Sequence, residues 1–175
     1  TDSGVGAYVV MCLKPAVQYT MFEQCKRAVL ARQGGAPDGL SPTSDEGHAL
    51  PLAKVYAPLV GGALKLLSVL DPMDVSVAEK TCADLGCSTG GFTEVLLSRG
   101  ARCVYAVDVG RGLLHWKLRN DPRVHLYEGV NARHLEELPE PIDLLVGDLS
   151  FISLRSILPT VHRLLRPGGE AVLLL

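Results

Sequence analysis

Along most of this chain, the apolar residues alternate between two patterns, one typical of strands and one typical of helices. From residue 58 to residue 175, short apolar runs of strand length alternate with segments whose apolar residues recur at helical spacing. The first predicted strand ends at Asp84, and the others cover residues 101–107, 123–127, 141–146 and 170–175. The predicted helices cover residues 58–70, 92–99, 112–119 and 153–165. Strands that alternate with helices predict an α/β fold, a Rossmann-like and mostly parallel sheet with helices on both faces.

Residues 1–57 follow no such alternation. The apolar run at residues 7–13 predicts a short strand, and residues 17–32 predict an amphipathic helix. Residues 34–51 are rich in Gly, Pro, Ser and Asp, a composition typical of a linker. We therefore predict an amino-terminal extension and linker of unknown role over residues 1–57, followed by an α/β domain over residues 58–175.

A glycine-rich turn follows the first strand of the domain, in the stretch Asp84-Leu-Gly-Cys-Ser-Thr-Gly-Gly-Phe92. Glycine has no Cβ, so the backbone can turn sharply here and approach a ligand closely. The next strand leads into Asp108, roughly 20 residues after the first glycine, where an acid in this type of fold accepts hydrogen bonds from a ribose diol. Strand, turn, helix and acid together predict a nucleotide-type site.

The turn departs from the dinucleotide-binding pattern G-x-G-x-x-G. Ser88 stands where that pattern has its second glycine, and the acid Asp84 precedes the turn. The order of Asp84, Gly86, the small Ser88 and Gly90 instead fits the loops of S-adenosylmethionine-binding methyltransferases, in which the acid can meet the ammonium group of the methionine moiety. Taken alone, such a loop is equally explained as a plain strand-to-helix connection.

Polar side chains also follow the later strands of the predicted sheet. Asn131 comes after the third strand, and Asp148 comes after the fourth. Ligands of parallel sheets bind at the carboxyl ends of the strands, where these two residues join Asp108 and the glycine turn. Each has an ordinary explanation as a turn or cap residue, and Asn131 is a candidate helix cap. Their succession at corresponding positions predicts a single site at this edge.

The same turn allows a second interpretation. Gly86-Cys-Ser88-Thr-Gly90 matches G-x-S-x-G, the nucleophile elbow of serine hydrolases, and Asp148 and His162 follow in the serine, acid, histidine order. His162 falls inside the predicted helix 153–165, however, whereas the histidine of a hydrolase lies on a loop. A serine hydrolase that uses Ser88 is therefore a remote alternative.

Composition narrows the classes of function. The net charge is −2, so no overall basic field marks a nucleic-acid binder, and any grip on RNA must be local. Five scattered cysteines form neither a disulfide framework nor a C-x-x-C metal pair, which predicts a reducing compartment and no metal site. No apolar run has the roughly 20 residues that span a membrane. The expected location is the bacterial cytoplasm, with an organelle as the alternative.

Seven sequence blocks, in a fixed order, carry a resemblance to a known family. They cover residues 61–66, 84–93, 104–110, 116–124, 131–135, 148–154 and 165–169. Over about residues 60–175, the chain closely resembles the TlyA-type (hemolysin A-like) ribosomal RNA methyltransferases of the FtsJ-like group. The resemblance implies transfer of a methyl group from S-adenosylmethionine to the ribose 2′-hydroxyl of cytidine in ribosomal RNA.

The resemblance also implies roles for single residues. Lys65, which spacing alone makes a solvent-facing helix lysine, falls on the first lysine of the family's catalytic Lys-Asp-Lys-Glu set, and Asp148 belongs to the same set. A ribose hydroxyl is a poor nucleophile at neutral pH, so a lysine must orient or deprotonate it. Asp108 would hold the cofactor ribose, Asn131 would lie by the adenine, and Asp148 beside the methyl donor. The remaining cofactor contacts implied are Asp84, Gly86, Ser88, Gly90, Gly91 and Phe92.

The sequence departs from the family in two respects. It stops at Leu175, before the family's second lysine and its glutamate, and residues 1–58 show no trace of the family's S4-type RNA-binding domain. We therefore expect a methyltransferase domain truncated after its fifth strand, with ribosomal RNA or ribosomal subunits as partner. The alternative is a non-catalytic remnant that binds S-adenosylmethionine or associates with RNA, and its last strand would lie unpaired at the sheet edge.

Overall fold

The computed structural model describes residues 9–12, 52–149 and 153–174, and this part of the chain contains one six-stranded sheet. Its strands are β1 (Val9–Cys12), β2 (Thr81–Leu85), β3 (Cys103–Asp108), β4 (Val124–Glu128), β5 (Ile142–Asp148) and β6 (Leu165–Leu174). They lie in the order β1-β6-β5-β2-β3-β4, and every neighbouring pair is parallel. The mostly parallel sheet predicted from the sequence is confirmed.

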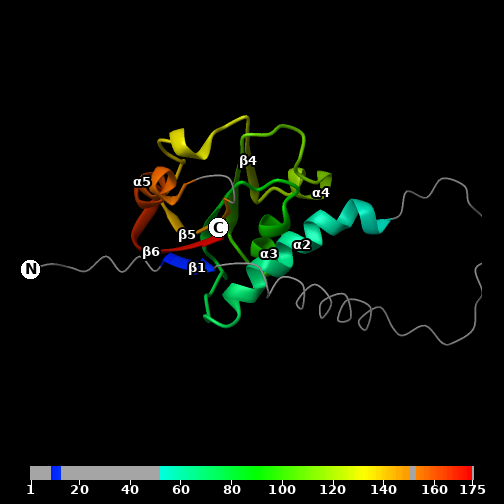
Figure 1. Cartoon of the computed structure of the whole chain (residues 1–175), viewed down its shortest axis with the longest axis horizontal. Helices are drawn as coiled ribbons and strands as arrows, with labels where there is room; N and C mark the ends of the chain where they lie inside the picture. The colour runs from blue at the N-terminus through cyan, green and yellow to red at the C-terminus, as the bar shows by residue number, and fades with distance from the viewer. Residues whose placement is uncertain (1–8, 13–51, 150–152, 175) are drawn as a thin grey trace, which may run out of the picture.

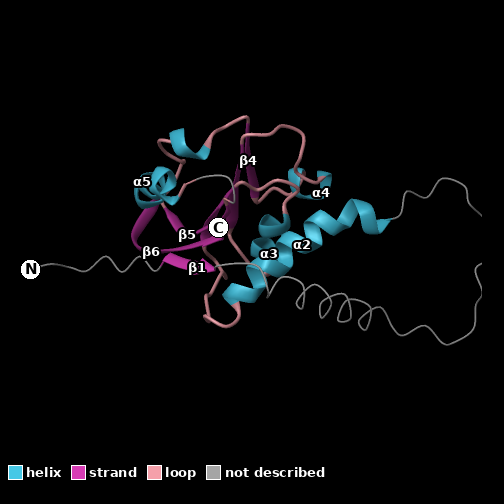
Figure 2. Ribbon diagram, in the orientation of Figure 1, coloured by secondary structure: helices cyan, strands magenta, loops and turns pink. Residues whose placement is uncertain are grey.

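Helices cover both faces of this sheet (Figures 1 and 2). They are α2 (Leu52–Leu70), α3 (Gly91–Ser98), α4 (Trp116–Arg119) and α5 (Leu154–Leu164), with a short 3₁₀ helix, η1 (Ala132–His134). Figure 1 shows α2 and α3 together on one side of the sheet and α5 on the other. Because both faces are covered, the central strands β2 and β3 are buried almost throughout.

Alternate residues of strands β2 to β6 enter two separate apolar cores. On one face Cys82 of β2 packs into a cluster with Leu66 of α2 and Leu96 of α3. On the other face Ala83, the next residue of β2, joins a cluster that contains Ile157 of α5. This strict alternation fixes the register of the sheet, because a shift by one residue would exchange the two faces.

The direction in which the chain adds strands reverses at β2. β3 and β4 follow on one side of it, whereas β5 pairs with its other side. A crevice at the carboxyl ends of the strands forms at such a reversal, and ligands bind there in open α/β sheets. The glycine turn after β2 and the end of β5 lie close together here, since a Cβ added to Gly86 would be 3.3 Å from the carbonyl oxygen of Asp148.

The last strand differs from its prediction in two ways. β6 includes the predicted turn at residues 166–169, which bulges out of the ladder between the pairs Ile142–Leu165 and Leu144–Glu170. Regular pairing starts at Glu170, where the predicted strand begins. The expectation of an unpaired final strand is wrong, because β1 pairs in parallel with β6 from Val9–Ala171 to Cys12–Leu174.

The element predictions for the rest of the chain need few corrections. The strand predicted at residues 7–13 is confirmed as β1, while the predicted helix 17–32 and linker 34–51 lie outside the described residues. α2 begins at Leu52 rather than at residue 58. α4 contains only the second half of the predicted helix 112–119, since Gly112 has a φ of 68° and His115 a ψ of 138°, neither of which an α-helix accommodates. The boundary predicted between residues 57 and 58 stays a prediction.

Candidate active site

The glycine turn after β2 has a backbone conformation that favours small residues. Gly86, Ser88 and Gly90 have φ angles of 81°, 49° and 100°, all in the left-handed region. The amides of Gly86 and Cys87 donate to the carbonyl oxygen of Val107 at 2.8 and 3.1 Å, which fixes the turn to the end of β3. The turn is therefore preorganised, with Ser88 exposed at its tip.

Asp108, the last residue of β3, joins the two loops beside it. Its Oδ2 accepts a hydrogen bond from the amide of Ser88 at 2.8 Å, and its Oδ1 accepts one from the amide of Gly110 at 2.7 Å. Each carboxylate oxygen has capacity for a further donor. Asp108 thus holds the loops that shape the site, and its role toward a ribose diol stays a prediction.

Asp84, which precedes the turn, is fully buried. Its Oδ2 accepts a hydrogen bond from the hydroxyl of Thr93 at 2.7 Å, and its Oδ1 is buried with no hydrogen-bond partner in the part of the chain that the structure describes. Burial raises the pKa of this carboxyl to about 7, against the opposing effect of the Thr93 hydrogen bonds. A buried acceptor without a partner is costly, and a cationic donor from a ligand would satisfy it.

Two cavities meet at the carboxyl edge of the sheet. The larger, of about 480 Å³, extends over the ends of β3 and β5 and is lined by Gly86, Ser88, Val107, Asp108, Val109, Leu113, Val130, Asn131, Ala132, Arg133, Asp148 and Leu149. The smaller, of about 270 Å³, lies between α2 and the turn and is lined by Gly61, Gly62, Lys65, Gly86, Cys87, Ser88, Thr89, Gly91, Phe92 and Asp148. Gly86, Ser88 and Asp148 line both cavities, so the glycine turn and the end of β5 separate two adjoining compartments.

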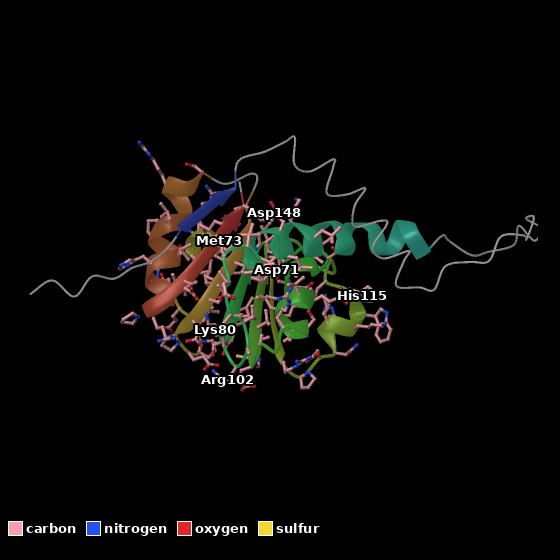
Figure 3. The ribbon with its side chains drawn as sticks, turned by 90° about the horizontal axis from the view of Figure 1, so that it is seen from below. Asp71, Met73, Lys80, Arg102, His115 and Asp148 are labelled. Atoms are coloured by element: carbon pink, nitrogen blue, oxygen red, sulfur yellow. The ribbon has the colours of Figure 1, made fainter. Side chains whose placement is uncertain are left out.

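An ion pair spans this junction. Lys65 Nζ of α2 donates to Asp148 Oδ2 of β5 at 2.5 Å, and the two side chains are 31% and 24% exposed. Figure 3 shows Asp148 at the opposite end of the sheet from Lys80 and Arg102. Those two residues pair with Glu170 and Glu140 at the amino edge. The Lys65–Asp148 pair is thus placed at the edge where a ligand binds.

The other predicted site residues have different surroundings. Asn131 lines the larger cavity and also caps η1, its side chain accepting from the amide of Arg133 at 3.1 Å, so the predicted cap is confirmed. Gly91 and Phe92 line the smaller cavity. Asp84 and Gly90 lie outside the lining described for the two cavities. Leu118 packs against Gly90 and leaves no room for a side chain, since a Cβ there would lie 2.2 Å from Leu118 Cδ1.

Sequence reasoning missed several cavity residues. Gly61 and Gly62 bring the backbone of α2 to the smaller cavity, and Val109 and Leu113 supply apolar walls to the larger. Val109 is 71% exposed and Leu113 is 48% exposed. The sequence signal that could have identified Val109 and Leu113 is their position next to glycines in an otherwise polar loop. Burial raises the pKa of the Cys87 thiol, so this residue is a neutral part of the wall.

The structure does not bring together the residues of the hydrolase alternative. Ser88 lies at the carboxyl edge of the sheet, after β2. α5 runs from the end of β5 back to Leu165, which pairs with Ile142 at the start of β5. His162 near the end of α5 therefore lies at the amino edge, away from Ser88. A serine, acid, histidine site is inconsistent with this topology.

The described residues lack two further kinds of feature. They contain no group of three or more His, Cys, Asp or Glu side chains that could hold a metal ion. Within the same ranges, no helix is long and apolar enough to cross a membrane.

A parallel sheet with a glycine turn, an acid at the end of the next strand and a ligand crevice is typical of Rossmann-like folds, to which many methyltransferases belong. The model of the FtsJ-like methyltransferase family matches residues 61–173. The chain belongs to the FtsJ-like methyltransferase family, and its TlyA-type resemblance is confirmed by the relatives described next.

Relatives match this chain over much of its length. It is 55% identical over 102 residues to the 16S/23S rRNA (cytidine-2′-O)-methyltransferase TlyA of Mycobacterium tuberculosis, covering 57% of this chain and 38% of that protein. It is 40% identical over 164 residues to YqxC of Bacillus subtilis, covering 87% of this chain and 57% of YqxC. The solved structure of a "putative hemolysin" from Streptococcus thermophilus is 35% identical, with a TM-score of 0.62, and the match covers 86% of this chain and 58% of that one. The chain thus spans 38 to 57% of the length of the two curated relatives.

Proposed function

We propose that this chain is the core of an S-adenosylmethionine-dependent methyltransferase that modifies the 2′-hydroxyl of a ribose, of cytidine by resemblance, in ribosomal RNA. The observation that carries the proposal is the Lys65–Asp148 pair at the junction of two cavities. The name of the Mycobacterium tuberculosis relative describes this reaction. Ribosomal RNA or a ribosomal subunit is then the partner, which agrees with the expected cytoplasmic location.

The residues of the site fit S-adenosylmethionine. Asp108 has acceptor capacity for its ribose, Asn131 lines the same cavity, and the unpartnered Oδ1 of Asp84 is an acceptor suited to its ammonium group. The turn from Gly86 to Phe92 leaves room for close approach of the ligand. When bound, this cofactor supplies a methyl group that is activated by a positively charged sulfur.

The chemistry left to the protein is to position the acceptor. Lys65 Nζ would donate to the ribose oxygen or, once it has released its own proton to solvent, take up that of the hydroxyl, and Asp148 would hold Nζ in place through the hydrogen bond already present. The pair lies at the shared wall, so an acceptor in one cavity and a methyl donor in the other would meet there. Orientation of this kind supplies much of the rate of a reaction between two bound molecules.

The test combines cofactor binding and methyl transfer. Calorimetric titration with S-adenosylmethionine should show saturable binding, and tritium from its labelled methyl group should appear in 16S or 23S ribosomal RNA as 2′-O-methylated nucleoside. Lys65→Ala should bind the cofactor and fail in transfer. Cofactor binding without transfer to any RNA would favour a non-catalytic remnant that binds the cofactor, and absence of cofactor binding by the folded protein would refute the methyltransferase and leave a remnant that only associates with RNA.

A further inference from the structure

The loop and short helix after β3 form a rim beside the larger cavity. This rim segment comprises residues 109–119 and includes α4. Val109 and Leu113 line the cavity at one end of the segment, and Trp116 and Lys117 belong to α4 at the other end. Figure 3 shows His115, the residue before Trp116, on the opposite side of the molecule from strand β6. None of the roles proposed above uses Trp116 or Lys117.

The rim segment is held firmly from behind. Leu114 and Leu118 are buried and fill the space over Gly90 of the glycine turn. The amide of His115 donates to the carbonyl oxygen of Thr89 at 3.1 Å, which ties α4 to that turn. The position of the rim is thus coupled to the turn that is proposed to bind the cofactor.

Glu128 at the end of β4 holds the outer side of the segment. Its Oε1 accepts from the amide of Gly112 and from Arg119 Nη2, each at 2.6 Å. The hydrogen bond from Arg119, followed by that from Gly112, lowers the pKa of this carboxyl, so both contacts favour the charged form. A segment fixed at both ends loses little further freedom when it binds a partner.

The outward side chains of this fixed segment are apolar and aromatic. Of the five large apolar side chains exposed among the described residues, three belong to it: Val109, Leu113 and Trp116, at 71%, 48% and 63% exposure. The nearest aromatic neighbour of Trp116 is His115, with ring centroids 5.9 Å apart and tilted by 36°. The exposure of Trp116, on a helix that is held in place by Leu114 and Leu118, is therefore not explained by the packing of the core.

The charge of the rim segment is opposite in sign to that of the whole chain. Arg111, Lys117 and Arg119 are basic and the segment contains no acid, whereas the chain carries a net charge of −2. Glu128 offsets Arg119, and Lys117 next to Trp116 is exposed. An aromatic ring beside a lysine is the combination that binds unpaired nucleotides, with the base on the ring and the phosphate on the ammonium group.

We infer that the rim segment is an RNA-binding platform, in which Trp116 stacks on an unpaired base of the substrate and Lys117 binds a neighbouring phosphate. This inference rests on the proposed RNA substrate and adds the place where nucleotides near the target are held. The platform grips RNA locally, without a basic field over the whole protein.

Trp116 is the single tryptophan of the chain, so its fluorescence reports on this site alone. The probe is a single-stranded RNA of about 12 nucleotides, within the range that single-strand-binding sites cover. RNA should quench the emission of Trp116 and shield it from iodide, and a fully paired duplex of the same sequence should do so far less. Trp116→Ala should weaken binding of labelled RNA roughly 5- to 150-fold, the effect of one stacked base, and Trp116→Phe should recover part of that loss.

Controls separate the inference from the proposed function. Leu158→Ala removes another exposed apolar side chain, on α5 across the sheet, and should leave RNA binding unchanged. Trp116→Ala should bind S-adenosylmethionine like the parent and methylate ribosomal RNA with a raised KM and a similar kcat. Lys117→Ala should lessen the salt dependence of RNA affinity.

Each other outcome overturns the inference in a recognisable way. RNA methylation with unchanged KM and unchanged Trp116 emission would leave the proposed function standing without the platform. Loss of self-association in Trp116→Ala, with unchanged RNA affinity, would assign this face to a second copy of the chain. If the parent binds cofactor but no RNA of any kind, the platform and the proposed substrate both fail.

Discussion

Lys65 and Asp148 are 83 positions apart in the sequence, yet Nζ and Oδ2 meet at 2.5 Å. Lys65 comes from α2, which precedes β2 in the chain, and Asp148 ends β5, which lies on the side of β2 away from β3. Their contact connects α2 to the sheet at the edge of the smaller cavity. The lysine proposed to position the acceptor is therefore joined directly to a residue that lines both cavities.

Replacement of Lys65 should abolish transfer more than binding. We expect Lys65→Ala to lower the rate of methyl transfer roughly 10²- to 10⁴-fold, the usual contribution of a positioned acid or base, while cofactor affinity stays close to that of the parent. The measurements are single-turnover transfer from labelled S-adenosylmethionine and calorimetry.

Lys65→Arg distinguishes orientation from proton transfer. Arginine keeps the positive charge and can donate hydrogen bonds, but it does not give up a proton at any accessible pH. Substantial activity in this variant would mean that Lys65 orients the hydroxyl, and inactivity would support a proton acceptor. Full activity of Lys65→Ala would remove this residue from the mechanism.

Asp108 should be needed for cofactor affinity. Asp108→Ala removes the acceptor proposed for the ribose diol and also releases the amides of Ser88 and Gly110. Hydrogen bonds to a charged group contribute about 1.5–3 kcal/mol each, so we expect affinity for S-adenosylmethionine to fall by at least roughly 10-fold. Asp121→Ala is the control, because Asp121 pairs with Arg123 and is outside the linings described for both cavities. Equal losses in the two variants would contradict the role.

Asp84 should make the stability of the protein depend on pH. Burial raises its pKa in the folded state to about 7, from an ordinary value of 3.8. Between these values the folded carboxyl holds a proton that the unfolded one has lost, so this group makes the free energy of unfolding fall as the pH rises from about 4 to about 7. Asp84→Asn has no such titration. The free energy of unfolding of Asp84→Asn minus that of the parent should therefore be larger at about pH 8 than at about pH 4. The increase should be on the order of a few kcal/mol.

The same carboxyl should make cofactor binding depend on pH. An ammonium group favours the charged carboxylate, so affinity for S-adenosylmethionine should rise as the pH increases through about 7, the folded-state pKa. Urea unfolding and calorimetry at about pH 5 and pH 8 measure the two effects separately. An affinity that is flat with pH in the parent would mean that Asp84 does not receive the ammonium group.

The rules of parallel sheets account for the part of the site that the sequence predicted. Asp108 and Asp148 each follow an apolar strand, and carboxyl ends of parallel strands meet at one edge. Asp84 was found in the same way, but its complete burial depends on how α3 packs over β2, with Thr93 as its partner. Short-range patterns do not contain that contact.

Other features depend on contacts between distant segments. Lys65 has the spacing of a surface helix residue, and only the family resemblance pointed to its role. The pairing of β1 with β6 joins residues at opposite ends of the described chain, which no local pattern specifies. The sequence predicts a helix from residue 112 of the rim segment, but Gly112, at a φ of 68°, and His115, at a ψ of 138°, have non-helical backbones, and α4 begins only at Trp116.

The neighbouring glycines of α2 should respond differently to the same substitution. Both lie inside a helix, where alanine is favoured over glycine by about 1 kcal/mol. A Cβ at Gly61 meets nothing within 4 Å, whereas a Cβ at Gly62 would lie 3.3 Å from the Cα of Gly91 at the start of α3.

Gly61→Ala should therefore raise the free energy of unfolding by about 0.5–1 kcal/mol. Gly62→Ala should lose that gain or reverse it, because the helix backbones of α2 and α3 must separate by a few tenths of an ångström. Urea unfolding of the two variants beside the parent measures the difference, and each serves as the control for the other. Equal stabilisation by both would show that α2 and α3 are not in close contact at Gly62 and Gly91, and the smaller cavity between α2 and the glycine turn would then be wider than described.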